Sequence, residues 1–124
     1  MARSPNQRIG DAGERRALAH LRARGMELVE RNWRCRFGEI DLVMRDGDAL
    51  VFVEVRRRRS LAGRYPSAAE TVGPRKRARL LRTARSYIAR LRPAPRCRFD
   101  VVAIEEDRHG EARLDWIRDA FHDG

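Results

Sequence analysis

The stretch GEIDLVMRDGDALVFVEVRRR, residues 38–58, decides the expected fold. It contains two runs of strand-forming residues, and Asp46-Gly47 between them is a strong signal for a two-residue hairpin turn. The expected strands are residues 39–45 and 49–57. Because side chains alternate along a strand, one face of this hairpin should be aliphatic, while the other carries the charged residues.

The patterns outside the hairpin predict two helices and three further strands. Asp11 and Glu14 have the spacing of a capping box, Gly25 is a typical helix stop, and Pro74 suits a first helical turn. The expected elements are helix 11–24, strand 26–34, strands 39–45 and 49–57, helix 74–91, and strands 99–104 and 112–118. The order αβββαββ predicts an α/β (α+β) fold, with a mixed sheet flanked by helices.

The length and composition fit a single domain over residues 1–124, in which 42% hydrophobic residues supply a modest core. Segment 57–73, rich in Arg, Ser, Gly and Pro, is expected to be a long flexible loop. No apolar run approaches the roughly 20 residues that span a bilayer, and Met1–Gly10 lacks a signal-peptide core. Cys35 and Cys97 fit neither a disulfide framework nor a zinc site. These features predict a cytoplasmic protein without a membrane segment.

The net charge of +10 is unevenly placed, because residues 105–124 carry −4 and the first 104 residues carry +14. Ten basic residues and no acid lie between Thr71 and Phe99. Charge of this kind favours a polyanion, so nucleic acid is the expected partner. The alternative is that arginine, which supplies 27 of the 28 basic residues, simply coats a soluble surface.

Three acids, Glu39, Asp41 and Glu54, lie among the aliphatic residues of the hairpin, where a carboxylate is costly unless it is paired. The expected turn places Asp41 opposite Phe52. Asp41 and Glu54 are then diagonal neighbours on one face, with Cβ atoms about 7 Å apart. The opposite face of the first strand is expected to hold Ile40, Leu42 and Met44.

A divalent cation would relieve the repulsion between such carboxylates, and oxygen ligands favour Mg²⁺ or Mn²⁺ over zinc. Asp41 and Glu54 are the expected ligands, with Glu39 as a further candidate. The alternative is that Glu39 and Glu54 form partly exposed ion pairs with Arg34, Arg36 or Arg56.

Lys76 is the only lysine, and it lies one turn before an apolar helical stripe of Leu80, Ala84, Tyr87 and Leu91. It should therefore face the sheet, where it can contact a phosphate or act in catalysis. The alternative is a side chain that snorkels at the edge of the core.

Glu14 shares a helical stripe with Leu18 and Leu21, so it should face the interior, either as a capping residue or beside the acids. Asp100 could approach these acids, but an acid at the start of a strand more often has a structural role. The aromatic residues expected in the core are Trp33, Trp116 and Phe121.

In combination, these motifs resemble a known family. An acid on one strand followed by VEVR on the next, Val53–Arg56, is similar to the PD-(D/E)xK, or restriction-endonuclease-like, nuclease superfamily. More closely, residues 10–121 resemble the uncharacterised bacterial YraN-like family. The matching motifs are Gly13-Glu14, Asn32, Gly38–Leu42, Val51–Arg56, Lys76 and Arg98–Val102. That family is in turn similar to archaeal Holliday-junction resolvases, which are dimeric metal-dependent nucleases.

The resemblance implies a restriction-endonuclease-like fold, a homodimer, and metal-dependent cleavage of branched or structured DNA. The residues to which it gives catalytic roles are Asp41, Glu54, Arg56 and Lys76. The metal ligands would be Asp41, Glu54, the backbone carbonyl of Val55, Glu39 and Glu14. The expected phosphate-contacting residues are Arg57, Arg58, Arg59, Arg64, Arg75, Lys76 and Arg79.

Arg56 stands where the family usually has lysine. Arginine effectively cannot lose its proton, so Arg56 would be a poor general base, although it can still stabilise charge on a phosphate. A non-catalytic nucleic-acid-binding module with a degenerate nuclease site is therefore the main alternative. A small basic protein that docks an acidic protein partner is a third.

Overall fold

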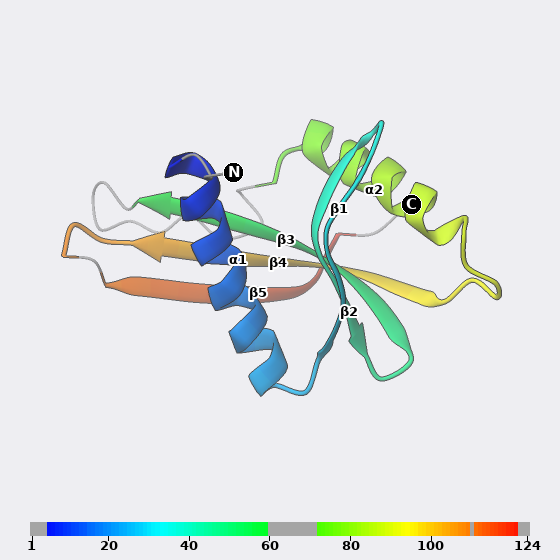
Figure 1. Cartoon of the computed structure of the whole chain (residues 1–124), viewed down its shortest axis with the longest axis horizontal. Coiled ribbons are helices and arrows are strands. Elements are labelled where there is room, and N and C mark those ends of the chain that lie inside the picture. Colours follow the sequence, from blue (N-terminus) through cyan, green and yellow to red (C-terminus); the bar gives the residue numbers. More distant parts are fainter. Residues whose placement is uncertain (1–4, 60–71, 110, 122–124) are drawn as a thin grey trace.

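The computed structural model describes residues 5–59, 72–109 and 111–121, which form one five-stranded sheet and two helices (Figure 1). The strand order is β1-β2-β3-β4-β5; β3 and β4 are parallel and the other neighbours are antiparallel. The elements are α1 (Pro5–Ala23), β1 (Glu27–Cys35), β2 (Gly38–Asp46), β3 (Ala49–Arg59), α2 (Pro74–Ile88), β4 (Arg96–Glu106) and β5 (Ala112–Phe121). The expected αβββαββ order and mixed sheet are confirmed.

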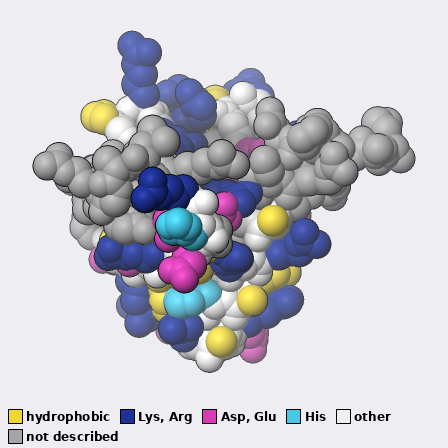
Figure 2. Space-filling model, turned by 90° about the vertical axis from the view of Figure 1, so that its left-hand side faces the viewer, with side chains coloured by type: hydrophobic (Ala, Val, Ile, Leu, Met, Phe, Trp, Pro, Cys, Tyr) yellow, Lys and Arg dark blue, Asp and Glu magenta, His cyan; other side chains and the backbone are white. Residues whose placement is uncertain are grey.

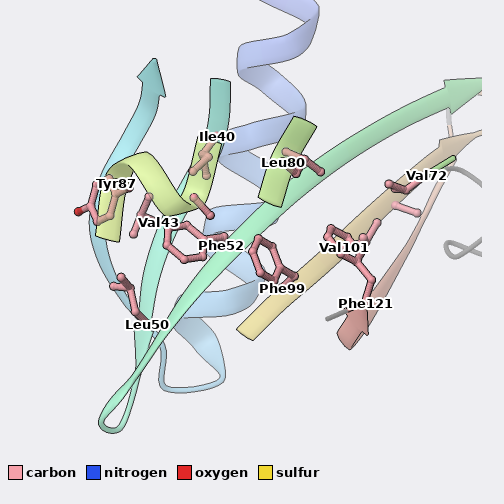
Figure 3. Packing of buried hydrophobic residues seen from close by; sticks show 12 residues of the cluster. Ile40, Val43, Leu50, Phe52, Val72, Leu80, Tyr87, Phe99, Val101 and Phe121 are labelled. Atoms are coloured by element: carbon pink, nitrogen blue, oxygen red, sulfur yellow. The ribbon is translucent and has the colours of Figure 1, made fainter. Parts of the chain in front are cut away.

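Alternation along β3 divides the core into two layers, one under each helix. Leu50 packs in the layer under α2, and its neighbour Val51 packs in the layer under α1. Figure 3 shows the α2 layer, in which Phe52, Phe99 and Phe121 form a row with successive ring centroids 5.4 and 5.0 Å apart. Because both faces of the central strands are covered, the first half of β3, residues 49–53, reads as a continuous hydrophobic run.

The buried face of α2 matches the expected stripe, with Leu80, Thr83, Ala84 and Tyr87 buried. Lys76 lies one turn before Leu80, as expected. The helix ends at Ile88, three residues earlier than expected. Pro93 explains the early end, because the residue before a proline is disfavoured in the helical conformation.

Helix α1 begins at Pro5, so the prediction of a capping box at Asp11 and Glu14 is wrong. Proline is well suited to the start of a helix, and the next residues contain no second proline to break it. Leu18 and Leu21 are buried, and the Glu14 side chain is only 12% exposed. The expectation that Glu14 faces the interior is therefore confirmed.

The pairing of β2 with β3 differs from the expected register. Asp46 pairs with Ala49 and Val43 pairs with Phe52, so the two turn residues are Gly47-Asp48 rather than Asp46-Gly47. Gly47 has a φ of +62°, and glycine at the first central position is typical of the type II′ hairpin turn. The shift keeps each residue on its face and brings Asp41 closer to Glu54 than the expected diagonal.

Ile40 also differs, because it packs with Val43 in the α2 layer rather than with Leu42 in the α1 layer. The pairing of β2 with β3 stops at Leu42, and the partner strand β1 is irregular at Asn32, whose φ is +51°. The hairpin of β1 and β2 therefore bends out of the sheet and rises alongside α2 (Figure 1).

The expected loop over residues 57–73 is wrong at its first end, where residues 57–59 continue β3 and pair in parallel with β4. At its other end, Val72 and Gly73 belong to neither a helix nor a strand, and Val72 is buried in the α2 layer. The remaining residues of that segment, 60–71, lie outside the described residues. Neither helix in the described part of the chain combines the length and apolar character needed to cross a bilayer.

Candidate metal centre

Three carboxylates meet between α1 and β2. Glu14 comes from α1, Glu39 and Asp41 come from β2, and one oxygen of each lies within 4.8 Å of the others. Residues two apart in a strand project from the same side, which brings Glu39 and Asp41 together. The interior-facing stripe of α1 adds Glu14. The structure thus brings together three of the five expected metal-binding residues.

Asp41 lies just beyond the last residue pair of β2 and β3. There its carboxylate, rather than a backbone carbonyl of β2, accepts a hydrogen bond from β3. Its Oδ2 accepts a 2.8 Å hydrogen bond from the backbone amide of Val55. Burial, followed by the negative charge of Glu54, raises the pKa of Asp41 to about 8, although the Val55 hydrogen bond opposes the shift. The charges of Glu14 and Glu39 add smaller increases to this pKa. The carboxylates therefore repel one another in the metal-free protein.

Glu54 lies beside Asp41 but points toward α2, and its side chain is only 6% exposed. Lys76 Nζ lies 2.7 Å from Glu54 Oε1, and Arg56 Nη1 lies 3.9 Å from the same oxygen. A buried carboxylate needs such partners. The structure therefore joins the two expected cations to Glu54, which is not part of the three-carboxylate cluster.

The acids of the centre also have arginine partners. Arg34 Nε lies 3.3 Å from Glu39 Oε2, and Arg31 Nη2 lies 4.0 Å from Glu14 Oε2. The ion pairs that formed the alternative for Glu39 and Glu54 are thus present. The Arg34 side chain is 73% exposed, and pairs of this kind contribute little energy, so they leave the carboxylates able to bind a cation.

The expected phosphate-contacting residues are only partly described. Arg75 and Arg79 are exposed on α2, on either side of Lys76 along the helix. Arg57 forms an ion pair with Glu106. The side chains of Arg58 and Arg59, and all of Arg64, lie outside the described residues.

Asp100 belongs to a polar cluster that sequence reasoning missed. Its two oxygens accept hydrogen bonds from Arg98 Nε and Nη2 at 2.9 and 3.0 Å, and from Trp116 Nε1 and the Asp119 amide at 2.9 Å each. Asp46 completes the cluster by pairing with Arg98 at 2.9 Å. The cluster ties β2, β4 and β5 together, so the structural reading of Asp100 is supported. The sequence signal for this cluster was that Arg98 and Asp100, two residues apart in β4, lie on the same face of the strand.

The aromatic residues expected in the core lie there or against it. Phe121 is buried in the α2 layer, and Trp33 packs against that layer. Trp116 packs against the α1 layer.

The fold and this geometry define an α/β protein with a candidate carboxylate metal centre formed by a helix and a hairpin. The chain belongs to the uncharacterised protein family UPF0102, whose sequence model matches residues 13–104. Family membership is thereby shown, and the kinship with nucleases stays a prediction.

The chain is similar to UPF0102 proteins of several bacteria. It is 52% identical over 115 residues to one from Ralstonia pickettii, covering 90% of this chain and 88% of the relative. It is 54% identical over 114 residues to one from Cupriavidus necator, covering 90% and 81%. A protein from Nitrosococcus oceani is 46% identical over 114 residues, covering 90% of each chain. The likeness therefore extends over nearly the whole chain.

Proposed function

We propose that this protein is a metal-dependent endonuclease-like nucleic-acid-binding protein that hydrolyses phosphodiester bonds in branched or structured DNA. The observation that carries the proposal is the meeting of Glu14, Glu39 and Asp41 within 4.8 Å, beside the Glu54–Lys76 ion pair. Clustered carboxylates next to partly exposed cations are the groups that a metal-assisted phosphodiesterase needs.

The donor set fits a hard divalent cation. It consists of carboxylate oxygens. The pKa of Asp41 is raised first by burial and then by the charge of Glu54, and a cation would relieve that repulsion. Glu14, Glu39 and Asp41 would hold Mg²⁺ or Mn²⁺, with Glu54 and the carbonyl of Val55 as further ligands. A bound ion of this kind supplies an acidified water and stabilises charge on phosphorus.

The chain's own cations would handle the phosphate. Lys76 and Arg56 share Glu54 as their partner, and the charge of Glu54 also acts on Asp41 of the centre. Lys76 would contact the scissile phosphate or transfer a proton, and Arg56 would stabilise charge without giving up its own.

The DNA backbone would lie along α2, where Arg75 and Arg79 are exposed near Lys76. Arg57, Arg58, Arg59 and Arg64 would contact flanking phosphates. Figure 2 shows further basic side chains, which are arginines because Lys76 is the only lysine, on several sides of the end of the molecule that carries the β4–β5 turn. Such contacts position DNA without reading its sequence. A homodimer would present two centres to a branched substrate.

Replacing Lys76 by arginine and Arg56 by lysine tests the catalytic roles of these two side chains. Lys76→Arg keeps the charge but adds bulk and removes the ability to deprotonate, so it should lower cleavage by about 10²-fold. Arg56→Lys should keep or raise activity. The measurement is nicking of labelled four-way, forked and linear DNA by wild type and both variants, with Mg²⁺, Mn²⁺ or EDTA.

Equal cleavage by wild type and Lys76→Arg would remove Lys76 from the mechanism. Cleavage by Arg56→Lys alone would mean that arginine at this position has silenced the site. If all three proteins bind DNA and none cleaves any substrate, the protein is the non-catalytic binding module that Arg56 suggests.

Metal affinity should depend on pH. Because the pKa of Asp41 is raised to about 8, this carboxyl group is protonated below that pH, and a cation must displace its proton. Mn²⁺ affinity should therefore rise about tenfold per pH unit up to about pH 8 and then level off. Calorimetric titration at pH 6, 7, 8 and 9 measures this, and equal affinity at pH 6 and pH 8 would contradict it.

A further inference from the structure

The turn between β1 and β2 exposes an aromatic ring. Phe37 is 36% exposed and Val29 is 39% exposed, and they are the exposed large hydrophobic residues within the described part of the chain. Phe37 lies at the tip of the hairpin that rises alongside α2 (Figure 1). A single ring is too small an apolar surface to hold a folded protein partner on its own.

The tip is held in place by a close contact with α2. Gly38 has a φ of +153°, and a Cβ atom at this position would lie 3.1 Å from Thr83 Oγ1 and 3.2 Å from Arg79 Cδ. Glycine thus lets the hairpin rest directly on the helix. Phe37 is consequently presented from a supported backbone, which lowers the entropy cost of stacking a ligand on it.

The surroundings of Phe37 are basic. The Arg36 guanidinium lies 4.8 Å from the centre of the Phe37 ring, and Arg79 is exposed on the helix below the tip. An aromatic ring interleaved with arginines is the combination that binds single-stranded nucleic acid, because bases stack on the ring while cations meet the phosphates. A cationic ligand would be disfavoured by the same charges.

Phe37 is also close in sequence to the carboxylate cluster. It precedes Glu39 by two residues, so the two Cα atoms are at most about 7 Å apart, the span of two extended residues. Stacked nucleotides are spaced by about 3.4 Å along one strand, so this distance corresponds to about two nucleotides. A base on Phe37 would therefore belong to a nucleotide near the phosphate at the centre.

We propose that Phe37 is a stacking platform for an unpaired base beside the phosphate held at the carboxylate cluster. The inference deepens the proposed function and rests on it for the position of that phosphate. A base in a continuous duplex is already stacked between its neighbours and cannot reach the ring. The platform therefore selects forks, branches and ends over continuous duplex.

Binding measured in EDTA separates this role from cleavage. Fluorescence anisotropy gives the Kd for a labelled fork with single-stranded arms and for a continuous duplex of the same length. Phe37→Ala should weaken fork binding about tenfold, the size of one base–aromatic stack, and change duplex binding less than about twofold. Phe37→Tyr should keep the wild-type preference. Val29→Ala is the matched control, an exposed residue of similar accessibility that should change neither Kd.

Equal loss on both substrates, no loss on either, or the same loss in Val29→Ala would overturn the platform. A dimer of wild type that dissociates in Phe37→Ala, seen by sedimentation, would also overturn it, because the ring would then be covered by a second copy. If wild type cleaves DNA and Phe37→Ala keeps the preference for forks, the stacking role of Phe37 is wrong and the proposed nuclease activity is supported. If no protein cleaves DNA and the preference for forks still depends on Phe37, the proposed nuclease activity is wrong and the stacking role is supported.

Discussion

Replacing Asp41 with asparagine should weaken Mn²⁺ binding by at least about tenfold and lower any metal-dependent cleavage with it. Asp41 is one of the three clustered carboxylates, and its charge also interacts with that of Glu54, so its loss removes a charged ligand from the site. The asparagine oxygen can still accept the hydrogen bond from the Val55 amide, which preserves the local backbone. Calorimetric titration with Mn²⁺ at pH 8 measures the effect.

The same substitution has an opposite effect on metal-free stability. The pKa of Asp41 is raised in the folded protein from 3.8 to about 8, so the folded state binds this proton more tightly than the unfolded state. The contribution of this bound proton to the free energy of unfolding is fully present below the ordinary pKa of 3.8, and it is lost as the pH rises through the folded-state pKa of about 8. Asp41→Asn should therefore gain stability relative to wild type between pH 6 and pH 9 in EDTA.

Asp115→Asn is the matched control for both measurements. Asp115 is a partly exposed acid on β5, away from the cluster, and its pairing with Arg113 is on the surface. It should leave Mn²⁺ affinity unchanged. If Asp41→Asn binds Mn²⁺ as tightly as wild type and Asp115→Asn do, the carboxylate cluster is not a metal centre.

Local patterns in the sequence predicted the elements and the faces of the central strands. Period-two alternation placed Leu50 and Val51 in different layers, and helical spacing placed Lys76 and Glu14 on the inner sides of their helices. These predictions succeeded because each depends on only a few neighbouring residues. The acids that alternation singled out are those that the structure brings near one another.

Features that depend on turn geometry or on distant segments were not predictable in this way. The register depended on which turn type Gly47 adopts, and the dipeptide Asp46-Gly47 is compatible with more than one. Ile40 changed layers because β2 leaves β3 and follows α2, which is a tertiary effect. The Lys76–Glu54 contact depends on how α2 packs on the sheet. The sequence could therefore predict that Lys76 faces the sheet, but not which residue it contacts.

Loss of the Asp100 carboxylate should destabilise the protein by about 3–5 kcal/mol, the cost of breaking a buried ion pair. Asp100 has a fully buried side chain and accepts four hydrogen bonds from three residues. In Asp100→Ala, Arg98 would keep only Asp46 as an anionic partner, and the indole nitrogen of Trp116 would lose its acceptor. Since domains of this size have about 5–15 kcal/mol of stability in total, the loss is a large fraction.

Urea unfolding of wild type, Asp100→Ala and Asp115→Ala measures this prediction at constant pH and salt. The Asp115 variant removes an equivalent carboxylate from an exposed pair on the neighbouring strand and should cost less than about 1 kcal/mol. A double variant, Arg98→Met with Asp100→Leu, should recover part of the loss, because replacing both charges by apolar groups leaves neither one buried alone. A cost below about 1 kcal/mol for Asp100→Ala would mean that the cluster does not hold β2, β4 and β5 together. Such a result would return Asp100 to the candidates for a functional role.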